Sequence, residues 1–247
     1  MQTMTIGEPV TEGCTTDSPA SSNDPKTTDL VELMLKDRRR LDALIRDDSL
    51  APELIPRLLA VALTGFTMFG IAATLILNLE PSLPAWVPRA RWSDGTWANL
   101  TLAYAVGLIA ATGVCLPSFY FYGLLAGVKL SMLQSAAHAV KCLAVTSVVL
   151  VGAVPIYVAV SLGMIVFSAP AELLRLTTTL GLVMPFVAGL WGVRTLFLGF
   201  SDLADTVPAY RKAERACFLR RLTVAWAACY TAVTPLMIIW LWTRLSG

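Results

Sequence analysis

Charge is scarce in this chain. Of its 247 residues, 15% are Asp, Glu, Lys or Arg and 56% are hydrophobic, whereas about a quarter of a soluble domain is usually charged. Most of the acidic residues lie before Glu53, so the remainder of the chain is poorer still in charge. Several runs in that remainder reach about 20 apolar residues, which is enough to cross a bilayer. We therefore expect an all-α, polytopic integral membrane protein.

Histidine and paired cysteines, the usual ligands of metals and haem, are also rare. His138 is the one histidine of the sequence, which excludes a bis-histidine haem or a histidine-rich metal centre built by this chain alone. The five cysteines share no C-x-x-C or metal-ligand spacing. We interpret them as reduced thiols that fill small apolar spaces. No cofactor and no metal site is expected.

Catalytic motifs and a strong net charge are missing as well. The sequence has no Ser/His/Asp set, H-E-x-x-H motif, Walker A loop or G-x-G-x-x-G motif, so we expect no catalytic residues and no enzyme. The formal net charge of +2 is too small and too dispersed to indicate a nucleic-acid partner. The expected spans contain no Asp or Glu, the usual ligands of a proton- or cation-coupled transporter.

The composition divides the chain into three segments. Residues 1–28 have no aromatic residue and many polar ones, which predicts a disordered tail. Residues 29–50 predict a cytoplasmic or interfacial amphipathic helix, because its apolar and basic residues fall on opposite sides. This helix lies either on the membrane surface, or against the bundle or a second copy of itself. Residues 51–247 form the transmembrane domain.

The distribution of Lys and Arg sets the expected topology. Spans are predicted at residues 55–79, 100–128, 142–167, 177–200 and 222–242, with an amphipathic connector at 129–141 and a charged loop at 201–221. With five spans, the basic segments fall mainly on one side, which places the N-terminus in the cytoplasm. A six-span alternative splits residues 100–141 and moves the charged loop outside. We prefer five spans.

Proline and small residues recur inside the spans. The prolines are Pro117, Pro155, Pro185 and Pro235, and Gly181 and Gly189 flank one of them at four-residue spacing. One interpretation is broken helices around a transported ligand. The other is helix kinks and close helix packing, which we favour because no carboxylate accompanies the prolines.

Four polar side chains are candidates for a pocket or for lipid contact. Arg194 is the one charge clearly inside a span, where it either lies buried or extends toward the membrane surface. Tyr120, Tyr122 and Tyr157 either line a pocket with polar tips or anchor the spans at the interface.

The run CLPSFY at residues 115–120, followed by LLAG at 124–127, resembles the CLPxxY…LxG run in the second span of a group of bacterial multi-spanning membrane proteins. Their third span has an internal proline, here in VPIY at 154–157. The group is loosely similar to Yip1-like five-span proteins. This chain departs from it at 97–100, where WANL replaces an expected lysine–proline pair. The resemblance covers roughly residues 58–200 and implies a multi-pass protein of the bacterial inner membrane, with a role in membrane organisation or trafficking.

These patterns favour a non-enzymatic membrane scaffold or accessory subunit. Its expected partners are the lipid bilayer and a membrane or cytoplasmic protein, or further copies of itself. The alternative is a transporter or channel for a neutral or anionic small molecule, using the kinked spans and Arg194.

Overall fold

The computed structural model describes residues 27–46, 50–79, 92, 95–125, 131–204 and 212–246. The secondary structure of these residues is helical, without strands. The helices are α1 (Thr27–Lys36), α2 (Arg38–Arg46), α3 (Ala51–Leu79), α4 (Thr96–Leu125), α5 (Met132–Val166), α6 (Ala171–Ala204) and α7 (Lys212–Ser246). The tail predicted for residues 1–28 lies outside the described residues, except for its last two, which begin α1.

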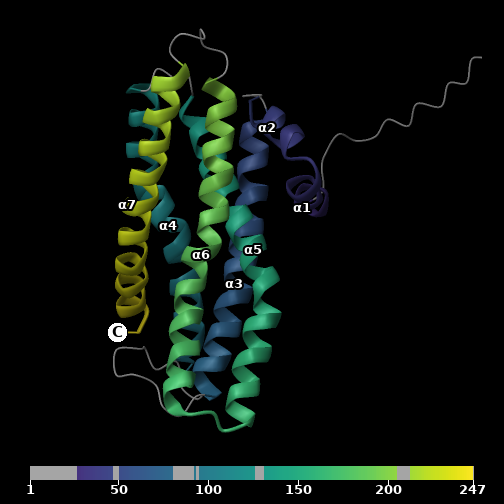
Figure 1. Ribbon diagram of the computed structural model, residues 1–247, viewed down its shortest axis with the longest axis vertical. Helices are drawn as coiled ribbons and strands as arrows, with labels where there is room; N and C mark the ends of the chain where they lie inside the picture. Colours follow the sequence, from purple (N-terminus) through teal and green to yellow (C-terminus); the bar gives the residue numbers. More distant parts are fainter. Residues whose placement is uncertain are drawn as a thin grey trace, which may run out of the picture.

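Helices α3 to α7 are long and apolar enough to cross a membrane. They stand side by side and alternate in direction, so the bundle is antiparallel, with α1 and α2 against the end where α3 begins (Figure 1). The all-α fold with five spanning helices is confirmed, and among the described residues there is no sixth helix of this kind. That the N-terminus faces the cytoplasm stays a prediction.

The connector predicted at residues 129–141 is wrong, because α5 begins at Met132. The Ser131 side chain accepts a hydrogen bond from the backbone N–H of Gln134 at 3.1 Å, and the Gln134 side chain accepts one from the backbone N–H of Ser131 at 3.3 Å. This reciprocal pair is a capping box, and its Ser-x-x-Gln signature was readable in the sequence. With 35 residues, α5 is about 52 Å long and exceeds a hydrocarbon core of about 30 Å.

The charged loop predicted at residues 201–221 is also shorter than expected. Helix α6 continues to Ala204, and α7 already begins at Lys212. Both helices therefore extend beyond the apolar runs from which the spans were predicted.

The segment predicted as one amphipathic helix is two helices, which we call together the N-terminal hairpin (α1 and α2). The Asp37 side chain accepts a hydrogen bond from the backbone N–H of Arg40 at 3.1 Å, so Asp37 caps α2 and separates it from α1. Leu30, Leu41 and Ile45 are fully buried in a cluster that includes residues of α3 and α5. Of the placements left open by the sequence, the structure shows the hairpin packed on the bundle.

Large aromatic residues and small residues share the bundle core. Phe66 and Phe69 of α3 are fully buried with Leu150 of α5 and residues of α4 and α6. Gly65 lies so close to Ser147 that an added Cβ would stand 2.7 Å from the Ser147 Cβ. Contacts of this kind, where a small residue lets two backbones approach, are typical of membrane helix pairs.

Candidate functional site

A buried ion pair joins the N-terminal hairpin to α5. Nζ of Lys141 donates a hydrogen bond to Oδ1 of Asp42, and both residues are buried. The two residues are 99 positions apart in the sequence. Charged side chains are rarely buried unless they are paired, and removal of one partner leaves an uncompensated charge. The pair therefore opposes any displacement of α2 from α5.

His138 lies one turn before Lys141 on α5 and is also buried. Gly199 of α6 packs against it: an added Cβ at Gly199 would stand 3.0 Å from Nδ1 of His138 and 3.7 Å from Oδ1 of Asp42. Residues of α2, α5 and α6 thus meet at one buried site. We call Asp42, His138, Lys141 and Gly199 the hairpin cluster.

The hairpin cluster was not predicted from the sequence, for two reasons. His138 and Lys141 fall within the connector predicted at residues 129–141, whereas the early start of α5 puts both inside a helix, where both are buried. Asp42 was not singled out within the amphipathic helix predicted at residues 29–50. Asp42 is adjacent to Leu41 and three residues before Ile45, so helical spacing already placed it at the edge of the apolar face.

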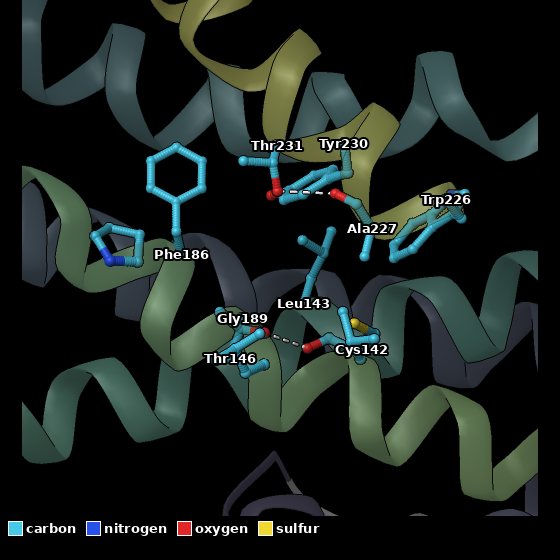
Figure 2. A pocket seen from close by; sticks show the side chains of 12 residues that line it. Cys142, Leu143, Thr146, Phe186, Gly189, Trp226, Ala227, Tyr230 and Thr231 are labelled. Carbon is cyan, nitrogen blue, oxygen red and sulfur yellow. Dashed lines mark hydrogen bonds between the residues drawn. The ribbon is translucent and has the colours of Figure 1, made fainter. Parts of the chain in front are cut away.

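A cavity of about 50 Å³ lies between α5, α6 and α7. Figure 2 shows its walls, which include Gly189 of α6 and Trp226 and Tyr230 of α7. Pro185 also lines it. Two of the residues singled out for packing, Pro185 and Gly189, therefore lie beside a gap in the helix packing.

The hydroxyl groups around this cavity donate to backbone carbonyls. Thr146 donates to the carbonyl of Cys142 and Thr231 to that of Ala227, each at 2.8 Å (Figure 2). Tyr230 donates to the carbonyl of Leu108 at 3.1 Å. Because these hydroxyl groups already donate to carbonyls, the wall offers a ligand few free hydrogen-bond donors. The volume of the cavity suits at most a few water-sized groups.

The residues proposed for a pocket or lipid contact lie at separate places. Arg194 is exposed on α6 and is not part of the cavity wall. Tyr157 is buried beneath Gly181, whose missing side chain makes room for the tyrosine ring. Tyr120 is half-buried with its ring 5.8 Å from that of Phe121. The side chain of Tyr122 lies outside the described residues.

The four prolines all lie inside helices that continue through them: Pro117 in α4, Pro155 in α5, Pro185 in α6 and Pro235 in α7. Pro185 is buried, whereas the other three are exposed on the bundle surface. The prolines therefore do not surround one common space.

Comparison with known proteins gives no indication of the function. No family model, curated protein or solved structure matches it. The similarity to Yip1-like proteins stays a prediction.

Proposed function

We propose that the protein is a non-enzymatic membrane scaffold or accessory subunit that binds a partner protein through its N-terminal hairpin. The observation that supports this proposal most is the docking of the hairpin. The Asp42–Lys141 ion pair and the fully buried Leu41 attach α2 to the spanning helices. A docked element presents a surface of constant shape, which lowers the entropy lost on binding.

The outer face of the hairpin has the composition of a binding site. Leu35 is 71% exposed at the end of α1. Glu32, Lys36 and Arg40 are exposed charged residues near it in the sequence. An exposed apolar side chain with a charged surround fits the usual anatomy of a protein interface. With the N-terminus inside, as the loop charges predict, this partner is cytoplasmic or shares the bacterial inner membrane.

Purification in mild detergent tests the proposal. We expect wild-type protein to form a particle of defined mass that contains a second protein or a second copy of the chain. Leu35→Ser should reduce the partner content at least fivefold, because it removes the exposed apolar contact. Phe167→Ser is the matched control, since Phe167 is 86% exposed at the other end of α5, and it should keep the partner. A strictly monomeric wild-type particle, or equal loss in both variants, would contradict the proposal.

The transport alternative draws support only from the cavity beside Pro185. That cavity measures about 50 Å³, and Arg194, Pro117 and Pro155 are not in its wall. Flux of a small neutral or anionic solute into proteoliposomes, abolished by Gly189→Leu, would favour transport over the scaffold.

A further inference from the structure

Two cysteines that are 114 positions apart lie in contact between α4 and α7. Sγ of Cys115 stands 3.7 Å from Sγ of Cys229. Cys115 is buried, whereas Cys229 is exposed on the outside of the bundle. Both belong to helical segments long and apolar enough to cross a membrane, Thr96–Phe121 and Arg220–Leu245. In a bilayer, the pair is a dithiol with one sulfur facing hydrocarbon and the other directly behind it.

The surrounding contacts hold α4 and α7 close together. Gly107 packs against Ile238, where an added Cβ would stand 3.2 Å from the Ile238 Cα. The Tyr230 hydroxyl donates to the Leu108 carbonyl at 3.1 Å. A disulfide needs a sulfur–sulfur distance of about 2.05 Å, so the 3.7 Å gap must close by side-chain rotation and a small shift of the helices.

We propose that Cys115 and Cys229 are a modification site at which membrane-dissolved peroxyl radicals form a disulfide between α4 and α7. One radical takes the hydrogen atom of the exposed Cys229 thiol, and the buried Cys115 thiol then passes its hydrogen atom to the Cys229 sulfur. A second radical takes that atom, so both radicals become hydroperoxides and each sulfur is left as a radical. The two S–H bonds break, two O–H bonds form, and the resulting sulfur radicals join in one S–S bond. The balance is two thiols and two peroxyl radicals giving one disulfide and two hydroperoxides. Each sulfur loses one electron and each radical gains one.

The apolar surroundings of the two thiols favour this class of oxidant over peroxides dissolved in water. Aqueous peroxides react with the thiolate form of cysteine, and an apolar environment disfavours a charged thiolate. Abstraction of a hydrogen atom creates no charge, so burial in hydrocarbon does not oppose it. A peroxyl radical formed in the lipid first meets the exposed Cys229, and Cys115 is then the neighbouring thiol that completes the bond.

The test uses the full chain in vesicles of unsaturated phosphatidylcholine. Peroxyl radicals are generated in the lipid with an oil-soluble azo initiator under air, and proteolytic peptides are examined by mass spectrometry with and without reductant. We expect linked peptides containing Cys115 and Cys229, formed at least tenfold faster than with hydrogen peroxide added to the water at an equal oxidant dose. Reductant should separate them.

Two serine variants complete the test. Cys229→Ser should abolish the link, and because that residue is exposed the variant should keep the wild-type melting temperature. Cys217→Ser is the matched control, because Cys217 is an exposed thiol of the same helix, and it should leave the link unchanged. The proposal is overturned if wild-type protein forms no 115–229 link while the lipid itself is oxidised, or if aqueous peroxide forms it equally fast.

Discussion

At the scale of single residues, burial decides what an ion pair contributes. Lys141→Met removes the ammonium group that binds the buried Asp42, and we expect it to lower the free energy of unfolding by about 3–5 kcal/mol. Lys36→Met acts on the exposed Lys36–Glu32 pair, 2.7 Å apart, and should cost below about 0.5 kcal/mol. Asp42→Asn combined with Lys141→Met should recover part of the loss, since neither charge remains. Thermal unfolding in detergent measures all three, and equal losses for the two lysine variants would contradict the burial of the pair.

The same substitution at two glycines of α6 should have opposite effects. An added Cβ at Gly189 meets nothing within 4 Å, whereas at Gly192 it would stand 2.7 Å from the Cys142 carbonyl oxygen. Gly189→Ala should be neutral or stabilise by up to about 1 kcal/mol, because alanine favours a helix over glycine. Gly192→Ala should destabilise by about 1–3 kcal/mol through steric overlap. The same unfolding experiment checks the signs, and a stabilising Gly192→Ala would refute this α5–α6 contact.

At the scale of elements, the N-terminal hairpin should detach when its apolar face is disrupted. Leu41 is fully buried, and loss of such a side chain typically costs about 2–5 kcal/mol. We expect Leu41→Ser to detach and unfold α2, so that trypsin cleaves after its basic residues at least tenfold faster in membrane vesicles. Phe167→Ser, at an exposed position at the other end of α5, should leave the cleavage rate unchanged. Similar rates for both variants would show that the hairpin is not held by this face.

At the scale of the whole molecule, five spanning helices place the two ends of the chain on opposite sides of the membrane. We expect an epitope tag before residue 27 and one after residue 247 to be accessible from opposite faces of sealed vesicles. The excess of Lys and Arg before the first span predicts that the N-terminal tag is cytoplasmic. Protease protection of each tag measures this directly. Two tags on the same side would require an even number of spans and contradict the bundle.

The sequence by itself determined the class of the fold and the number of spanning helices. Long apolar runs indicate the fold class and the number of spans, because a segment that crosses a bilayer must be an internally hydrogen-bonded helix of a minimum length. The helical state and the length of such a segment both follow from local composition. The start of α5 is also a local signal, because the Ser131–Gln134 capping box lies within four consecutive residues. The apolar side of the hairpin is a local pattern as well, so the sequence alone predicts it.

Only the tertiary structure decided which distant residues meet. The Asp42–Lys141 pair and the Cys115–Cys229 pair join residues 99 and 114 positions apart. Neither pair follows from spacing within a helix, because contact between two helices depends on their rotation about their axes and on the small residues that let them approach. Only the structure likewise showed the surroundings of the candidates for a pocket or for lipid contact: Arg194 is exposed on α6, Tyr157 is buried beneath Gly181, and Tyr120 lies beside Phe121.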